Sequence, residues 1–345
     1  MKKEFILIVL AGLLIIPAFS QHPPLDKNWE MVFVDNFSTF NTRIWHKEYG
    51  AHNAGEGDKE SIHFCTYDNV YIENGKLVLR AQKQISQCIP NNGKPCRYNG
   101  YHMYTSGAIN SNILYKYGYF EINAKLPGST GYFPAFWLIG GNENLVTNNC
   151  WYNEIDIFEA YGDRTGEVES RAHSYIKCPM VDEVDRTEKE RHAVNYATGY
   201  HWYGLEWNRD KITWYIDRKI VRQIPNDKSI DNVYIQNPMF IVINVGLNSA
   251  TTGDNLISSS TIFPNYMYVD QANVWKLIYD CGTVVNEIQD YNTFYAVRKS
   301  ISLSGLSSLS LGENVSLRAT DFIELKAGFE VPIGAELYLD INPCE

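Results

Sequence analysis

Three acidic residues, Glu154, Asp156 and Glu159, lie within six positions of an otherwise apolar stretch. In a regular strand Glu154 and Asp156 face the same side, while the intervening isoleucines face the core behind them. Glu159 has the opposite parity, so one extra residue near Ile157-Phe158, a β-bulge, is needed to return it to the face of Glu154. The spacing therefore predicts a bulged strand on which three carboxyl groups converge.

Two converging carboxyl groups suit the hydrolysis of a glycosidic bond. One acts as nucleophile, and the other, with a pKa raised by the neighbouring negative charge, acts first as acid and then as base. We expect Asp156, between them, to hydrogen-bond to the nucleophile and to help hold the proton on the acid. A solvated edge strand and a calcium site are the alternatives. The isoleucines disfavour the first, and the small number of available backbone oxygens disfavours the second.

The surrounding chain has the pattern of many short strands separated by turns. Residues 70–72 and 77–81 flank Asn74-Gly75, the pair typical of a type I′ hairpin, and residues 212–216 and 219–224 flank Asp217-Arg218. Residues 119–126 alternate between apolar and polar side chains, and the nearly all-apolar stretch 240–245 indicates a central strand. Strands spread over about 250 residues predict an all-β fold, a large antiparallel β-sandwich.

The composition changes near Cys281. We interpret residues 281–300 as a connector, because they lack strong periodicity. Residues 301–345 are rich in Ser and Gly and carry short alternating stretches, so they predict a small β-rich C-terminal module. Surface attachment, secretion sorting and simple packing remain open as its role.

The first twenty residues resemble a signal peptide. Lys2 and Lys3 precede the apolar run 5–16, and Ala18-Phe19-Ser20 places small residues at a cleavage site. The run is short for a membrane span, so export is favoured over a retained anchor. We therefore expect a secreted protein, extracellular or at the cell surface, with the periplasm as an alternative and no membrane insertion.

The charge balance disfavours a nucleic-acid partner. The chain has 40 Asp and Glu against 30 Lys and Arg, a net charge of −10. A polyphosphate would be repelled by this excess, which no run of basic residues interrupts. Hydrophobic residues at 45% and aromatic residues at 14% are sufficient for a large folded core.

The chain has seven cysteines, and an oxidising compartment would allow disulfides. No CxxC spacing occurs, which disfavours a zinc ribbon. Sequence alone leaves the connectivity open. Our preferred pairing is Cys88–Cys96, Cys150–Cys178 and Cys281–Cys344, with Cys65 left as a thiol.

The stretch Glu154 to Glu159 resembles the ExDxxE signature of glycoside hydrolase family 16, in its bulged branch of laminarinases, agarases and carrageenases. Further similar segments follow in family order at residues 29–37, 74–79, 106–109, 117–121, 125–127, 131–138, 206–207 and 214–217. The resemblance implies a concanavalin-like β-jelly roll over residues 25–280. It also implies a retaining mechanism with Glu154 as nucleophile, Glu159 as acid and base, and Asp156 assisting.

The resemblance and the chemistry of sugar rings suggest further binding residues, because aromatic side chains stack on the apolar faces of sugars. The candidate substrate-binding residues are Trp137, Tyr132, Trp151, Trp207, His173, Glu121 and Asn123. Asp270 resembles a family position that helps to bind a structural calcium ion, although the residues after it differ from the usual pattern. Hydrolysis itself needs no cofactor.

The substrate is less clearly indicated than the reaction. Residues 150–153 replace the Pro and Gly that usually precede the motif in laminarinases, and residues 244–249 differ from the usual Gly-rich phrase. We favour an endo-acting, laminarinase-like enzyme on β-1,3-glucan. The alternatives are a hydrolase of agar, porphyran or carrageenan-type galactan, a transglycosylase, and a glycan-binding protein without catalysis. We expect a monomer whose partner is a polysaccharide.

Overall fold

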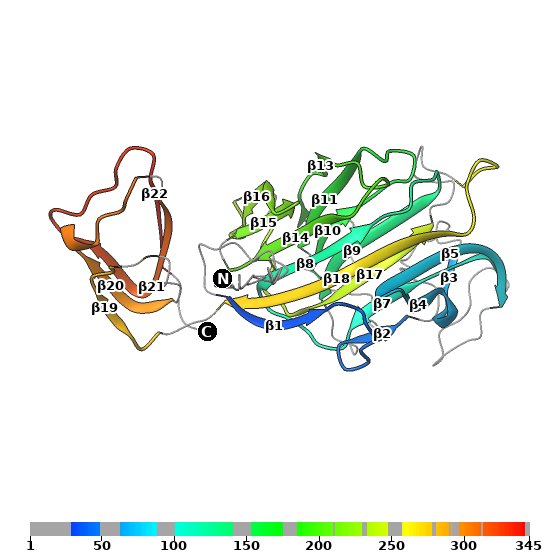
Figure 1. The fold of residues 1–345 in the computed structure, drawn as a ribbon, viewed down its shortest axis with the longest axis horizontal. Coiled ribbons are helices and arrows are strands. Elements are labelled where there is room, and N and C mark those ends of the chain that lie inside the picture. The colour runs from blue at the N-terminus through cyan, green and yellow to red at the C-terminus, as the bar shows by residue number, and fades with distance from the viewer. Residues whose placement is uncertain are drawn as a thin grey trace, which may run out of the picture.

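The computed structural model describes residues 29–48, 63–87, 101–140, 153–174, 185–209, 211–229, 233–247, 257–277, 281–289, 291, 297–311 and 313–341. The regular elements among them are strands, apart from short 3-10 turns, and most of the strands form two sheets packed face to face (Figure 1). The prediction of an all-β, antiparallel sandwich is confirmed.

Within the described residues, one sheet has ten strands and follows the order β16-β15-β14-β8-β18-β5-β6-β3, with β1 beside β18 and β4 beside β5. All of its pairs are antiparallel except β3 with β6. The bounds are β1 Trp29–Asp35, β3 His63–Cys65, β4 Val70–Glu73, β5 Lys76–Gln87, β6 Tyr101–Ser106, β8 Gly118–Lys125, β14 His201–Trp207, β15 Lys211–Ile216, β16 Lys219–Pro225 and β18 Asn265–Leu277.

The facing sheet has eight described strands in the order β12-β11-β10-β9-β17-β7-β2, with β13 beside β11. It contains the acidic strand β10 near its middle, and the apolar β17 is central as predicted. The bounds are β2 Trp45–Lys47, β7 Ala108–Ser111, β9 Tyr132–Gly140, β10 Glu154–Glu159, β11 Glu167–Ser174, β12 Asp185–Arg186, β13 Glu190–Ala193 and β17 Met239–Leu247.

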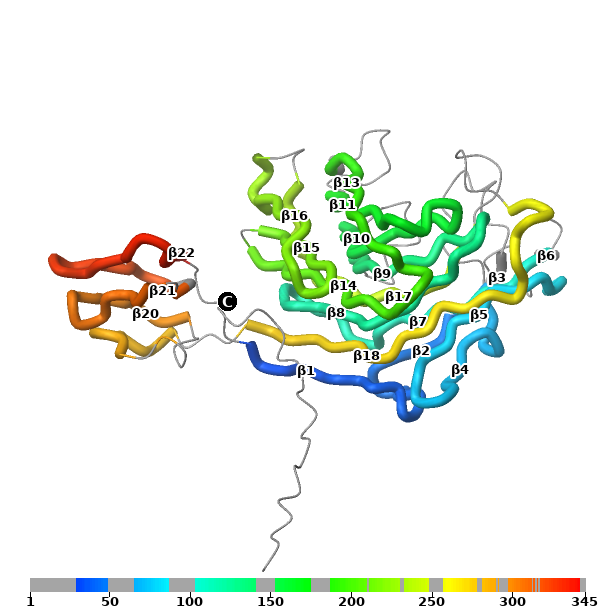
Figure 2. Tube along the Cα trace, turned by 45° about the horizontal axis from the view of Figure 1, so that its top comes forward, coloured from blue at the N-terminus to red at the C-terminus, as the bar shows by residue number. Residues whose placement is uncertain are grey.

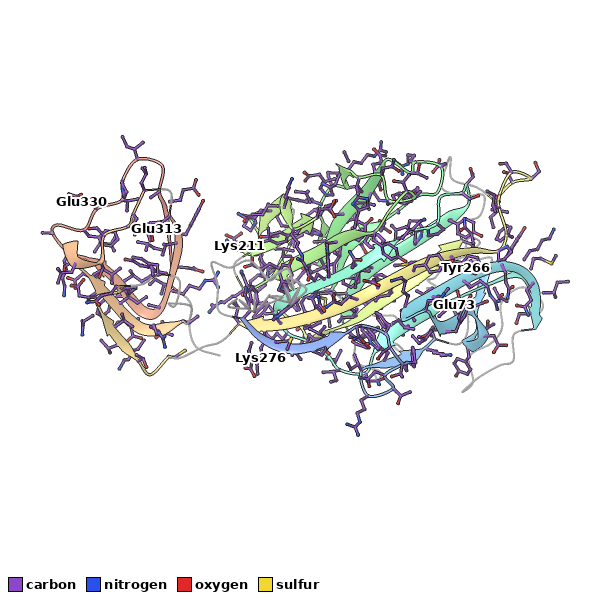
Figure 3. The ribbon with its side chains drawn as sticks, in the orientation of Figure 1. Glu73, Lys211, Tyr266, Lys276, Glu313 and Glu330 are labelled. Carbon is purple, nitrogen blue, oxygen red and sulfur yellow. The ribbon has the colours of Figure 1, made fainter. Side chains whose placement is uncertain are left out.

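The core lies between the two sheets, where side chains fill the space (Figure 3). The predicted apolar face of β8 is buried: Phe120 and Ile122 join Ile155 and Phe158 of the facing sheet in one cluster. Each fully buried side chain of this size stabilises the fold by about 1.5–3 kcal/mol. This packing fixes the faces of β10, since its apolar side chains must point inward.

Both predicted hairpin turns have the backbone geometry of type I′. Asn74 and Gly75 have φ of 51° and 68°, and Asp217 and Arg218 have φ of 47° and 65°. Arg218 tolerates this region because its guanidinium lies 4.0 Å from the ring centroid of Trp202 and forms an ion pair with a buried glutamate. The two turns set the register of β4 with β5 and of β15 with β16.

A separate parallel sheet follows the sandwich and is drawn apart from it in Figure 2. It consists of β19 Val284–Asn286, β20 Arg298–Leu303, β21 Asn314–Leu325 and β22 Glu336–Ile341. Ile301, Leu303 and Leu317 belong to its own hydrophobic cluster. The sheet begins within residues 281–300, the predicted connector, so β structure starts earlier than expected.

The described cysteines give partial information on the disulfides. Cys65 is a buried thiol whose sulfur lies 3.5 Å from Oγ of Ser106. Cys281 is disulfide-bonded, and the remaining cysteines, together with the expected signal peptide, lie outside the described residues. The part of the chain that the structure describes contains no helix that is long and apolar enough to cross a membrane.

Candidate active site

Strand β10 contains the expected bulge. In its ladder with β9, Asp156 pairs with Trp137, whereas Phe158 pairs with Phe136, so Ile157 is the extra residue. The ladder with β11 shifts over the same interval. The prediction of a bulge at these positions is confirmed.

The bulge sorts the side chains of β10 onto two faces. Ile155, Ile157 and the phenylalanine after it join the core. The three carboxyl groups of Glu154, Asp156 and Glu159 interact with one another instead, because the charges of Asp156 and Glu159 both act on Glu154. The backbone irregularity therefore brings together the acids that a regular strand would have divided.

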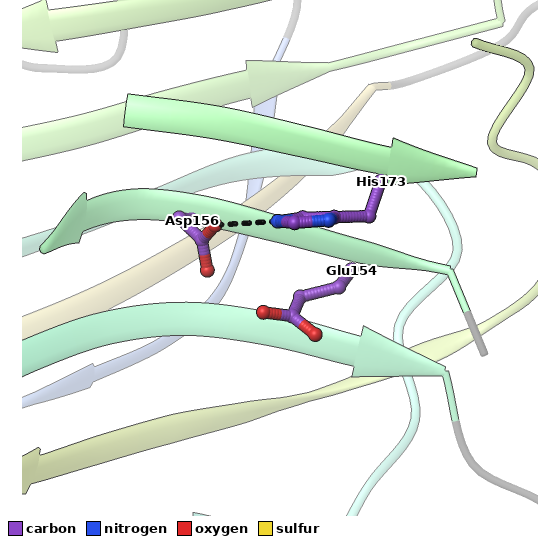
Figure 4. Close-up of side chains that lie close together, drawn as sticks. All are labelled: Glu154, Asp156 and His173. Atoms are coloured by element: carbon purple, nitrogen blue, oxygen red, sulfur yellow. Dashed lines mark hydrogen bonds and ion pairs between the residues drawn. The ribbon is translucent and has the colours of Figure 1, made fainter. Parts of the chain in front are cut away.

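The side chains of Glu154, Asp156 and His173 lie close together, with a hydrogen bond between Asp156 and His173 (Figure 4). His173 of β11 lies opposite Glu154, and its Nε2 is 3.1 Å from Oδ2 of Asp156. The carboxyl group of Asp156 also acts on that of Glu154 and raises its pKa. The polar atoms of the three residues lie within 4.8 Å of one another. That spacing would also suit a cation.

Burial is the main cause of the raised pKa values of Glu154 and Glu159. Burial, followed by the charge of Asp156, raises the pKa of Glu159 to about 8. Burial and then the charge of Asp156 also raise the pKa of Glu154 well above its ordinary value. Glu159 thus retains a proton near neutral pH, as a general acid must.

A cation lies beside Glu159. Nζ of Lys189 is 3.6 Å from Oε2 of Glu159 and 3.2 Å from Oε2 of the buried Glu169, and it donates a 2.6 Å hydrogen bond to the Tyr161 hydroxyl. Arg164 also pairs with Glu169 at 3.0 Å. Lys189 lowers the pKa of Glu159 and so opposes part of the effect of burial.

Trp137 lies next to Asp156 in the ladder and on the same face as the carboxyl groups. Its Nε1 donates a 2.9 Å hydrogen bond to Oδ1 of Asn244, and its ring packs with Ala135 and Val242 in a small cluster separate from the main core. The hydrogen bond and the packing hold the ring in one orientation. Of the predicted aromatic residues, Trp137 is the one that the described structure places beside the acids.

Other predicted residues are not brought to the carboxyl groups. Tyr132 and Trp207 are fully buried in the core, where they donate hydrogen bonds to the main-chain oxygens of Ile262 and Ile235. Trp151 lies outside the described residues. These placements indicate packing roles for Tyr132 and Trp207.

The polar candidates on β8 lie in the other sheet. Glu121 is buried and contacts Arg218 at 3.3 Å and Asn273 at 3.0 Å, rather than any residue of β10, and Asn123 lies on the same strand. Asp270 forms an ion pair with Lys76, which a calcium ion would have to displace. Alternation along β8 shows that Glu121 and Asn123 share one face of the strand. It does not show that β8 belongs to the sheet opposite β10.

Lys189, Glu169 and Asn244 were not identified from the sequence. Lys189 lies 30 residues after Glu159 and carries no motif, so only the tertiary structure reveals its position. The sequence offers only a weak indication for Glu169, which is its place on the strand expected to pair with β10. Glu169 and Asn244 come from the neighbouring strands β11 and β17, and Lys189 lies just before β13.

Comparison with known proteins agrees with this geometry. The model for glycosyl hydrolases family 16 matches residues 58–260. The laminarinase catalytic domain of Thermotoga maritima MSB8 superimposes with a TM-score of 0.60 at 26% identity, covering 72% of this chain and 99% of that one.

Two relatives are similar in sequence. Glucan endo-1,3-beta-glucosidase A1 of Niallia circulans is 27% identical over 271 residues, which are 73% of this chain but 39% of that protein. Kappa-carrageenase of Pseudoalteromonas carrageenovora is 26% identical over 337 residues, 88% of this chain and 80% of that protein. With the family match spanning more than half of its length, the chain belongs to the family 16 glycosyl hydrolases.

Proposed function

We propose that the protein is a retaining endo-β-1,3-glucanase that acts by double displacement. The observation that carries the proposal is the bulged strand, which groups Glu154 with Glu159, the latter with a pKa of about 8. In the first step Glu159 gives its proton to the glycosidic oxygen, while Glu154 bonds to the anomeric carbon and the leaving sugar departs. In the second step Glu159 takes a proton from water, which attacks the same carbon and releases Glu154.

Asp156 and His173 assist the nucleophile in this scheme. Asp156 lies close to Glu154, within 4.8 Å between their polar atoms, so it can orient the Glu154 carboxyl group for attack. His173 holds Oδ2 of Asp156 by a hydrogen bond, which limits rotation of that carboxyl group. We propose that these residues need no cofactor for hydrolysis, and that the chain acts as an exported monomer.

The choice of β-1,3-glucan rests on the similarity to a glucan endo-1,3-beta-glucosidase and to a laminarinase catalytic domain. The carrageenase relative keeps a galactan as the second candidate. A sulfated galactan would be favoured by cations that face the cleft. Lys189 and Arg164 are both paired with Glu169, whereas Arg171 acts on Glu154 and Glu159, so the cations do not separate the two substrates and the choice rests on the similarity alone.

Product analysis on a panel of polymers tests the proposal. The protein is incubated with laminarin, mixed-linkage glucan, agarose, porphyran and carrageenans, with Glu154→Gln as the matched control. We expect oligosaccharides from laminarin, with the β-anomer formed first, and none from the variant. Cleavage of a galactan instead would replace the substrate assignment. An α-anomer as first product would overturn the retaining mechanism, and activity in Glu154→Gln would overturn the role of Glu154.

A further inference from the structure

Trp214 connects the opposite sheet to the catalytic strand. It lies on β15, is 1% exposed, and its Nε1 donates a 2.9 Å hydrogen bond to the main-chain oxygen of Asp156. That carbonyl precedes Ile157, the extra residue of the bulge. The contact therefore crosses the core and ends where the β10 ladder loses its regular pairing.

A second contact of the same kind lies beside the first. Arg222 of β16 pairs with Trp214 in the ladder, and its guanidinium lies 4.9 Å from the centroid of the Trp214 ring. Arg222 NH1 donates to the main-chain oxygen of Ser170 at 2.8 Å and to its hydroxyl oxygen at 3.1 Å. Ser170 lies on β11 between the partners of Asp156 and Glu159, directly opposite the bulge.

A bulge interrupts ladder hydrogen bonds, and buried main-chain oxygens then need other donors. Trp214 and Arg222 supply such donors on both sides of the irregularity. Glu154 precedes the bulge and keeps regular partners on β9 and β11, whereas Glu159 follows it. A change in the shape of the bulge would therefore move Glu159 relative to Glu154.

We propose that Trp214 and Arg222 form an inter-sheet clamp that fixes the bulge and thereby aims Glu159 at the glycosidic oxygen. Both are positioning residues, since they act through the main chain of β10 and β11. The inference rests on the proposed function, because it assigns the acid role to Glu159. It predicts that loss of the clamp weakens protonation of the leaving group more than it weakens the attack by Glu154.

The variant Trp214→Phe tests the clamp, because it removes the N–H donor and keeps an aromatic ring. Its matched control is Trp207→Phe, which removes a similar 3.1 Å indole hydrogen bond to the Ile235 main-chain oxygen elsewhere in the core. The value of kcat/KM is measured on laminarin and on 2,4-dinitrophenyl β-laminaribioside. Dinitrophenolate leaves without protonation, so its release does not need the acid.

We expect Trp214→Phe to lower kcat/KM on laminarin by about 10- to 100-fold and on the aryl glycoside by less than about threefold. Trp207→Phe should lower kcat/KM only slightly, and by the same factor on both substrates. Equal losses on both substrates in Trp214→Phe, or no loss on laminarin, would overturn the clamp.

Two further measurements keep the outcomes distinct. If Trp214→Phe does not fold, as judged by near-ultraviolet circular dichroism, Arg222→Lys is measured on the same two substrates and judged by the same criteria. If the wild-type protein turns over neither substrate, the proposed glucanase function fails and the clamp fails with it. If the wild-type protein is active on both substrates and the variant loses activity on both equally, the clamp is overturned and the proposed glucanase function stands.

Discussion

The ammonium group of Lys189 lies 3.6 Å from Oε2 of Glu159, the carboxyl group that the proposed mechanism uses as acid and base. The other charged groups that act on Glu159 are Asp156, Glu169 and Arg171. Burial is the largest cause of the raised pKa, Asp156 and Glu169 add to it, and Lys189 and Arg171 oppose it. Lys189 is thus a cation placed to limit how strongly the acid holds its proton.

Replacing Lys189 with Met should move the alkaline limb of the pH profile upward. Without the cation, the pKa of Glu159 rises above its value of about 8, so the protonated acid persists to higher pH. The measurement is kcat/KM on laminarin against pH. Lys189→Arg keeps the charge and should leave the limb near its original position. An unchanged or lower limb in Lys189→Met would contradict the electrostatic role.

Azide should distinguish the roles proposed for Glu159 and Glu154. Glu159→Ala should still form the covalent intermediate from 2,4-dinitrophenyl β-laminaribioside, because this leaving group needs no acid. Added azide then attacks without a base, speeds turnover by about tenfold or more, and gives the β-glycosyl azide. Glu154→Ala should give the α-azide by direct displacement. Nuclear magnetic resonance of the products identifies the anomers, and exchanged anomers would reverse the two roles.

Replacing His173 should uncouple Asp156 from Glu154. His173→Phe removes the 3.1 Å hydrogen bond to Asp156, so the Asp156 carboxyl group can rotate away from Glu154. We expect kcat to fall by about 10- to 100-fold, with KM changed less than about twofold, because the interaction serves the transition state. His173→Gln keeps a donor and should recover part of the rate. A rise in KM alone would indicate a substrate contact instead.

Local sequence signals predicted the parts of the fold that depend on local geometry. The parity of Glu159 required the bulge, and Asn74-Gly75 required its hairpin, because both constraints act within a few residues. Trp207 was assigned to the cleft by resemblance and lies in the core. Alternation along a strand separates two faces, but the pairing of sheets decides which face meets the core.

The partners that tune the site come from distant parts of the chain. Lys189 reaches Glu159 from beyond β11, and Trp214 reaches Asp156 from the opposite sheet. No spacing rule predicts such contacts, because they follow from how two sheets stack and not from the period of one strand. The acids themselves could be identified from the sequence, whereas their electrostatic surroundings required the tertiary structure.

A final prediction concerns the ion pair between Arg218 and the buried Glu121 in the ten-stranded sheet. The Arg218 guanidinium lies 3.3 Å from its carboxyl group, and burial raises the pKa of Glu121 even with this partner present. Arg218→Ala leaves the charge without its cation, which should lower the free energy of unfolding by about 3–5 kcal/mol at neutral pH. Urea unfolding at pH 7.5 measures this loss, and Arg218→Lys is the charge-conserving control.

The stability of Arg218→Ala should also depend on pH, in a direction that the pKa of Glu121 sets. A carboxyl group whose pKa is higher in the folded than in the unfolded state binds more protons when folded, so stability falls as pH rises from the ordinary value of 4.5 toward the raised value. Arg218→Ala raises the folded pKa of Glu121 further, so the pH range over which stability falls extends upward.

The stability gap is the difference in the free energy of unfolding between the wild type and Arg218→Ala. It should therefore narrow at pH 5, where Glu121 takes up a proton in the variant. In a Glu121→Gln background the gap should be small at both pH values, because no charge is left to bury. A gap of equal size at pH 5 and 7.5 would show that Arg218 acts through its stacking on Trp202 and not through Glu121.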